Sequence, residues 1–169
     1  MKRSGVLISA TAALLMGLAS LAQAADTVSP ADFAEEASAK GIAEIEAGKL
    51  ALEKGTNAEV KKFAQSMIDD HTRANNELKA LAEKKNLKVS DDAELMNKAK
   101  AMILQVRDGE NFDEAYANNQ VVAHEQTIEL FRKATKSDDA EVSAWAEKTL
   151  PKLEHHLEMA KDLQSKTRK

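Results

Sequence analysis

Three of the four histidines in this 169-residue sequence occupy positions typical of buried ligand residues. When each surrounding segment is drawn as an α-helix, at about 100° per residue, His71, His124 and His156 fall on its apolar face. His155 falls on the polar face instead. Glu44 lies on the apolar face of a fourth segment, so each of four helices contributes one inward ligand-type residue. Glu44 and the three inward histidines are therefore the candidate metal ligands.

Histidine-rich sites of this kind suit transition metals. A neutral imidazole is a common metal ligand, and nitrogen ligands favour Zn, Cu or Fe over Ca or Mg. A buried ionised carboxylate is costly unless an ion pair or a cation compensates it. We predict that Glu44 pairs with His71 within one hairpin. Such a pair could also exist without any metal, as could histidines that are simply hydrogen-bonded core residues.

The heights of these residues along their helices do not match when they are counted from the nearest tight turn. At about 1.5 Å per residue, the mismatch is about 7 Å between Glu44 and His71 and about 9 Å between His124 and His156. Helix tilt could absorb it, helped by a bend or bulge at Pro151. Otherwise the four residues form two separate sites.

Missing residue types and motifs exclude several classes of function. The sequence has no Cys, which removes disulfides, iron–sulfur clusters, thiolate zinc sites and covalently attached haem. It also lacks a nucleophilic Ser elbow, a Gly-rich phosphate loop and a His-Glu-x-x-His motif. We predict no catalytic residues and favour a non-enzymatic role. We also expect no haem, because the histidines do not form a sandwich at one clear height.

Helices must position these residues, because only six Gly and two Pro occur in the chain. Ser29-Pro30 opens the first helix, and Thr56-Asn57-Ala58-Glu59 forms a capping box that opens the second. Asp138 and Glu141 form a capping pair for the last helix. The predicted long helices cover about residues 30–54, 57–86, 111–136 and 139–164, with a shorter helix between Ser90 and Gly109.

Tight turns join the first two long helices and the last two, and a long crossover with the short helix separates the two hairpins. The segments 58–64 and 140–146 also resemble each other weakly. This is the connectivity of ferritin-like bundles. We therefore predict an all-α, ferritin-like four-helix bundle.

The first 24 residues are typical of a secretory signal. A basic start, Met1-Lys2-Arg3, precedes an apolar run over 6–21 and the small-residue exit Ala22-Gln23-Ala24. We predict a signal peptide over 1–24, a single mature domain over 25–169 and location in the periplasm. The apolar run is short for a membrane span, so we expect no stable membrane insertion once the signal is cleaved.

The charge of the mature chain excludes some partners. The whole chain has 24 basic and 28 acidic residues, and the signal removes two basic ones, which leaves a net charge of −6. A mildly acidic protein without a basic stripe is a poor nucleic-acid binder. A protein or cell-envelope partner stays open, as does the oligomeric state.

Six short segments carry a further signal: Gly41 to Ala51, Val60 to Ala64, Met67 to His71, Phe112 to Tyr116, Val122 to His124 and Thr149 to Leu157. Together they resemble the DUF4142 family of exported bacterial proteins. The resemblance covers about residues 30–165 and implies a ferritin-like fold and an envelope location, without a defined activity. Ferritin-like di-iron sites use Glu-x-x-His pairs, whereas Ile68 and Leu153 stand three residues before His71 and His156. A single histidine-rich site is therefore expected rather than a di-iron oxidase.

Two functional hypotheses stay open at this point. One is a bundle that binds a metal ion or small ligand in its core, with a role in metal handling or envelope stress. The alternative is a non-enzymatic envelope module that binds a partner through its surface.

Overall fold

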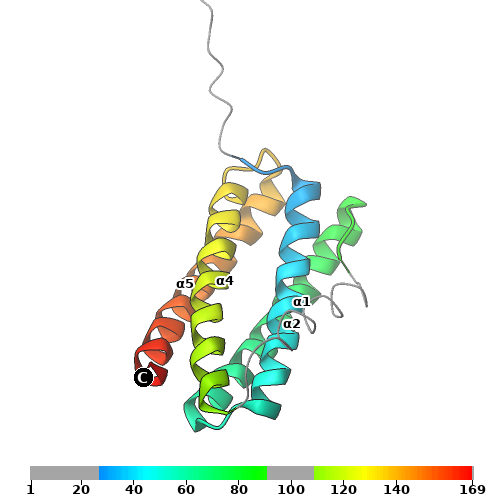
Figure 1. Ribbon diagram of the computed structural model, residues 1–169. Helices are drawn as coiled ribbons and strands as arrows, with labels where there is room; N and C mark the ends of the chain where they lie inside the picture. The colour runs from blue at the N-terminus through cyan, green and yellow to red at the C-terminus, as the bar shows by residue number, and fades with distance from the viewer. Residues whose placement is uncertain (1–26, 91–108, 169) are drawn as a thin grey trace, which may run out of the picture.

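The computed structural model describes residues 27–90 and 109–168 of the chain (Figure 1). Within these ranges the regular structure is entirely helical, which confirms the predicted all-α four-helix bundle. The predicted signal peptide over 1–24 and most of the crossover with its short helix lie outside the described residues. The helices are α1 (Pro30–Lys54), α2 (Ala58–Lys85), α4 (Glu110–Ala134) and α5 (Ala140–Thr167).

The helix ends follow the capping signals, with two shifts. Ser29 caps α1 as predicted, because its hydroxyl oxygen accepts the backbone N–H of Asp32 at 3.1 Å. The N-cap of α2 is Asn57 rather than Thr56, since the Thr56 hydroxyl donates to Asp113 instead. The N-cap of α5 is Asp139, one residue after the predicted Asp138.

Two long-range contacts fix the direction of each helix. Asp113 in the first turn of α4 binds Thr56 in the α1–α2 turn, so α2 and α4 begin at the same end of the bundle. Lys85 at the end of α2 pairs with Asp139 at the start of α5 at 2.7 Å. In Figure 1, α1 and α5 accordingly run downward while α2 and α4 run upward. The crossover therefore returns the chain from the upper end to the lower end, as in ferritin-like bundles.

Each helix packs mainly against two antiparallel neighbours. α1 packs against α2 and α4, and α5 packs against α4 and α2, which puts α2 and α4 on one diagonal. Helix α5 continues through Pro151 to Thr167 without interruption. None of the helices within 27–90 and 109–168 has the length and apolar character that a membrane span requires.

The buried apolar residues form two clusters. The lower cluster includes Phe63, Met67, Phe112 and Tyr116. The upper cluster is built around Phe33, Phe131 and Trp145, with ring centroids 5.0 to 5.9 Å apart. Between the two clusters lies a layer of buried polar side chains from all four helices: Glu44, His71, Gln120, His124 and His156.

Candidate metal centre

The three inward histidines lie at one level of the bundle, so the predicted height mismatch is wrong. Counted from the common lower end, His71 is the fourteenth residue of α2 and His124 the fifteenth of α4. His156 is the twelfth residue from the end of α5, and Glu44 the eleventh from the end of α1. The spread of four residues corresponds to a rise of about 6 Å, which side chains can span.

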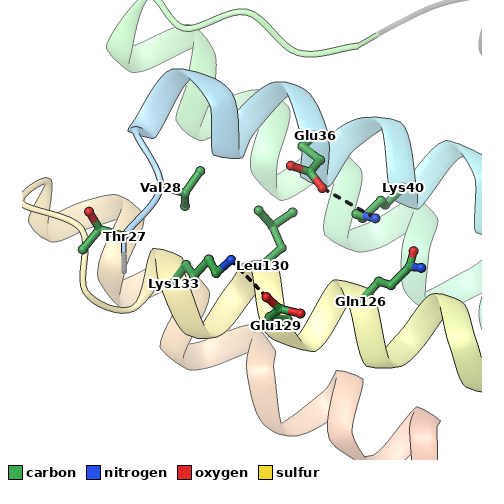
Figure 2. Close-up of a pocket in the computed structure, with 8 residues that line it drawn as sticks. All are labelled: Thr27, Val28, Glu36, Lys40, Gln126, Glu129, Leu130 and Lys133. Carbon is green, nitrogen blue, oxygen red and sulfur yellow. Dashed lines mark ion pairs between the residues drawn. The ribbon is translucent and has the colours of Figure 1, made fainter. Parts of the chain in front are cut away.

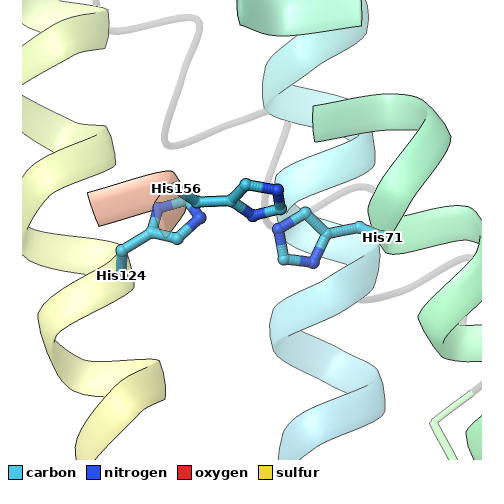
Figure 3. A group of neighbouring side chains, drawn as sticks. All are labelled: His71, His124 and His156. Atoms are coloured by element: carbon cyan, nitrogen blue, oxygen red, sulfur yellow. The ribbon is translucent and has the colours of Figure 1, made fainter. Parts of the chain in front are cut away.

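The imidazole rings converge in the bundle core (Figure 3). The ring centroids of His71, His124 and His156 lie 5.5 to 5.6 Å apart in all three pairs. One potential ligand nitrogen from each ring lies within 4.8 Å of the other two. The residues are 1 to 6 % exposed, whereas His155 is exposed, as predicted. The structure thus brings together three of the four predicted ligands.

Hydrogen bonds set the tautomers of two of these rings. Nδ1 of His124 lies 2.9 Å from the Gln120 carbonyl oxygen, and Nε2 of His156 lies 3.0 Å from Oδ2 of Asp70. A carbonyl or an ionised carboxylate can only accept, so these two nitrogens carry the hydrogens. Nε2 of His124 and Nδ1 of His156 are left with free lone pairs.

Three of the four remaining ring nitrogens have no partner. Nε2 of His71, Nε2 of His124 and Nδ1 of His156 are buried and make no hydrogen bond within the described part of the chain. A buried polar atom left in this state costs about 1–3 kcal/mol. One such atom on each of three converging rings is therefore a costly arrangement unless something occupies the space between the rings.

The surroundings keep the rings of His71 and His156 neutral. Burial, together with the nearby His124 and His156, lowers the pKa of His71 to about 3. Burial also lowers the pKa of His156 to about 4, although the hydrogen bond to Asp70 opposes the shift. Neutral imidazoles with free lone pairs are the form that binds metals.

Glu44 is buried beside this group but is not a member of it. The carboxylate is not among the atoms that lie within 4.8 Å of one another. Burial raises the pKa of Glu44, while His124, the Gln120 amide and Lys40 favour its ionised form. Direct metal binding by Glu44 therefore stays a prediction, since its carboxylate would have to move toward the imidazoles.

The predicted pair of Glu44 and His71 is wrong. Both side chains are buried, so the helix faces are right, but no ion pair joins them in the described chain. Glu44 is influenced by Gln120 and His124 of α4, whereas His71 is influenced by the other two histidines and Asp70. The rotation of α1 directs the carboxylate toward α4.

Two glycines allow α1 to approach α2 closely on either side of Glu44. A Cβ at Gly41 would lie 2.1 Å from Oδ1 of Asn75, and one at Gly48 would lie 2.8 Å from Cγ1 of Ile68. Neither distance is sterically possible without movement. Both glycines lie in one of the segments that resemble the family. They allow the backbone of α1 to pack closely against α2 on either side of Glu44.

Three further residues with polar side chains, Asp70, Gln120 and Tyr116, belong to or border this layer. Asp70 orients His156 and also pairs with Lys152 at 3.1 Å, which extends the contact from the buried ring to the surface. Gln120 and Tyr116 lie one and two helical turns before His124 on the same face of α4. Their four-residue spacing was a usable signal, but nothing in the sequence gave the orientation of Asp70.

A depression with a volume of about 420 Å³ lies on the surface between α1 and α4, apart from the buried polar layer (Figure 2). Its charged side chains pair along their own helices, Glu36 with Lys40 at 3.6 Å and Glu129 with Lys133 at 3.0 Å. These pairs are solvated and balance one another. The groove therefore offers much weaker evidence of a ligand than the polar layer does.

Comparison with known proteins identifies the family but no activity. A family described as a domain of unknown function (DUF4142) matches residues 16–163, so the chain belongs to the DUF4142 family. This confirms the resemblance drawn from the short segments. No curated protein and no solved structure matches the chain.

Proposed function

We propose that this protein binds one transition-metal ion through Nε2 of His71, Nε2 of His124 and Nδ1 of His156. Two observations support the proposal most strongly: each of the three buried rings offers one nitrogen within 4.8 Å of the other two, and each ring has a buried nitrogen without a hydrogen-bond partner in the described residues. A purely structural histidine would be expected to hydrogen-bond through its buried nitrogens.

The residues fit such an ion in chemistry and in size. Zn–N bonds of about 2.0–2.1 Å in a tetrahedral site put the nitrogens about 3.3 Å apart. Modest ring rotations would bring the three nitrogens to that separation. Asp70 and the Gln120 carbonyl hold the far nitrogens of two rings, the arrangement commonly seen around metal-bound histidines. Zn, Cu and Fe are the candidates for a site of this donor set.

The site suits a single ion rather than a di-iron centre. Its members are three imidazoles, and the positions three residues before His71 and His156 are apolar, Ile68 and Leu153. Three protein ligands leave at least one coordination position for another group. We further propose that the protein acts in the periplasm in metal handling or envelope stress, on the basis of the signal-like segment over 1–24.

Thermal melting of the metal-free protein with added Zn, Cu, Fe or Mn tests the proposal. A ligand that binds only the folded state stabilises it by about 2.7 kcal/mol at one hundred times its Kd. We expect one of these metals to raise the melting temperature of the wild type and of His155→Ala. The same metal should not raise it in His71→Ala, His124→Ala or His156→Ala.

His155→Ala is the matched control, because His155 is adjacent to His156 but exposed. An equal loss of the metal effect in His155→Ala and His156→Ala would mean that the ion binds at the surface. No shift with any of the four metals would reject the metal site and favour the hypothesis of a surface-binding module.

A further inference from the structure

Four unpartnered polar atoms lie in the same layer but do not belong to the histidines. They are Oε2 of Glu44, both side-chain amide atoms of Gln120 and the hydroxyl of Tyr116. The three residues are 0 to 5 % exposed. Gln120 contributes both of its amide atoms to this set, and the Glu44 carboxyl is the group close enough to interact with that amide. A polar occupant would give these atoms partners.

These atoms form one continuous group next to the histidines. Tyr116, Gln120 and His124 are spaced four residues apart on α4, so their side chains follow one another along one face. Glu44 on α1 is close enough to Gln120, His124 and Tyr116 to affect their electrostatics or be affected by them. The group therefore borders the three-histidine site on the side of α1 and α4.

Hydrogen-bonding capacity indicates what such a group would hold. The Tyr116 hydroxyl can donate or accept, the Gln120 amide offers two donors and an acceptor, and the Glu44 carboxyl offers oxygen atoms. Aromatic rings close the lower side, since Phe112 and Phe63 pack against Tyr116 with centroids 6.1 and 6.2 Å away. Near-complete burial limits the occupant to a molecule of very few atoms.

We propose that Glu44, Gln120 and Tyr116 form a subsite for a small exogenous ligand on the metal, in the simplest case water or hydroxide. The inference rests on the proposed metal site, whose open coordination position this ligand would fill. It assigns Glu44 a role that differs from direct coordination: the carboxyl holds the exogenous ligand by hydrogen bonding. The site would then accept small anions that replace water.

Azide binding to the Co(II)-loaded protein tests this assignment, because the visible spectrum of Co(II) reports both metal binding and ligand exchange. We expect Co(II) to bind the wild type, Gln120→Met and Tyr116→Phe with similar affinity. Azide affinity should fall about tenfold in each variant, as expected for one lost hydrogen bond. Both variants should fold, because each keeps a side chain of similar size and the Tyr116 hydroxyl makes no hydrogen bond within the described residues.

Glu46→Gln is the matched control for Glu44→Gln. Glu46 is also buried and lies two residues along α1, but it pairs with Lys49 at 2.7 Å. We expect both Glu44→Gln and Glu46→Gln to retain Co(II). Because azide can only accept hydrogen bonds, the amide of Glu44→Gln should hold azide at least as tightly as the carboxyl does, and Glu46→Gln should leave azide binding unchanged.

The outcomes separate this inference from the metal site itself. Failure of the wild type to bind Co(II) overturns both proposals. Normal Co(II) binding with unchanged azide affinity in Gln120→Met and Tyr116→Phe overturns the subsite alone. Loss of Co(II) from Glu44→Gln, as complete as the loss from His124→Ala, would make Glu44 a direct ligand and contradict the role given to it here.

Discussion

Two polar regions of this bundle differ in whether their buried hydrogen-bonding atoms have partners. At the lower end, the Asp113 carboxylate is 3 % exposed and accepts from three donors: the Thr56 N–H at 3.1 Å, the Thr56 hydroxyl at 2.6 Å and the Asn57 N–H at 2.9 Å. In the middle layer, seven buried polar atoms have no partner within the described residues. The lower region satisfies its hydrogen bonds within the protein, whereas the middle layer does not.

The difference separates a structural polar contact from the proposed binding site. The Asp113 cluster ties the α1–α2 turn to the first turn of α4, so it fixes which end of the bundle the crossover returns to. The middle layer draws side chains from all four helices but leaves seven of its nitrogen and oxygen atoms without a hydrogen bond in the described residues. Removing Asp113 should therefore harm folding, whereas changes in the middle layer should mainly harm ligand binding.

The largest expected effect is on folding, in Asp113→Ala. This substitution removes the buried acceptor of three part-buried, charge-assisted hydrogen bonds, and we expect it to lower the free energy of unfolding by about 3–5 kcal/mol. Urea denaturation measures the change, with the exposed Asp138→Ala as control. A loss below about 1 kcal/mol would show that the lower contact is not the structural element proposed here.

Acid should destabilise the metal-free protein through the middle layer. His71 and His156 have folded-state pKa values of about 3 and 4, below the unfolded value of 6.5. The unfolded chain thus binds protons first, so stability is retained above pH 6.5 and falls as the pH decreases toward the folded pKa values. Between pH 7.5 and 5.5 we expect a loss of about 1 kcal/mol per histidine.

The double variant His71→Leu/His156→Leu isolates this effect, because the titrating carboxylates elsewhere contribute equally to both proteins. Urea denaturation at the two pH values should give a smaller acid loss in the double variant than in the wild type. Equal losses would mean that the two imidazoles are not held neutral by the fold.

Asp70→Asn should weaken metal binding without removing it. Asp70 accepts from Nε2 of His156 and so leaves Nδ1 free for the ion. An amide at this position can favour the wrong tautomer, and loss of such a partner commonly costs about 10–100-fold in metal affinity. Metal titration of the neighbouring Asp69→Asn, which alters an exposed carboxylate, should match the wild type. Unchanged affinity in Asp70→Asn would show that His156 binds no metal through Nδ1.

The smallest expected effect is on the metal-free stability of His71→Leu at pH 7.5. This variant replaces the imidazole, which has an unpartnered buried nitrogen, with an apolar side chain. The free energy of unfolding should therefore change by no more than about 1 kcal/mol. If His71→Leu lowers the free energy of unfolding as much as Asp113→Ala does, the two polar regions do not differ as proposed and His71 has a structural role.

Sequence reasoning located the helices and their faces because the signals are local. Ser29-Pro30 specifies the start of α1, and the 100° step per residue separates the buried His156 from the exposed His155. The predicted positions of the histidines along the bundle axis are wrong because the tight turn of one hairpin gives no reference level for the other hairpin. The contact that aligns the hairpins joins Thr56 to Asp113, which are 57 residues apart, and no local pattern predicts it.

Local periodicity also predicts which side chains of the site enter the core, but it does not predict which of them meet. Periodicity places Glu44 on the inner face of α1, but it does not give the rotation that directs the carboxylate toward α4 rather than His71. Asp70 lies at the edge of the apolar face of α2, and only the packing of α5 makes it a partner of His156. Residue type and spacing therefore predicted which side chains enter the core, and the packing of the hairpins determined which of them meet.

Elemental analysis of untagged protein purified without chelators tests the central claim most directly. We predict about one transition-metal ion per chain in the wild type and in His155→Ala, and almost none in His124→Ala. A folded wild type that holds no metal and takes up none when Zn, Cu, Fe or Mn is supplied would contradict the account, as would an equal metal content in His124→Ala.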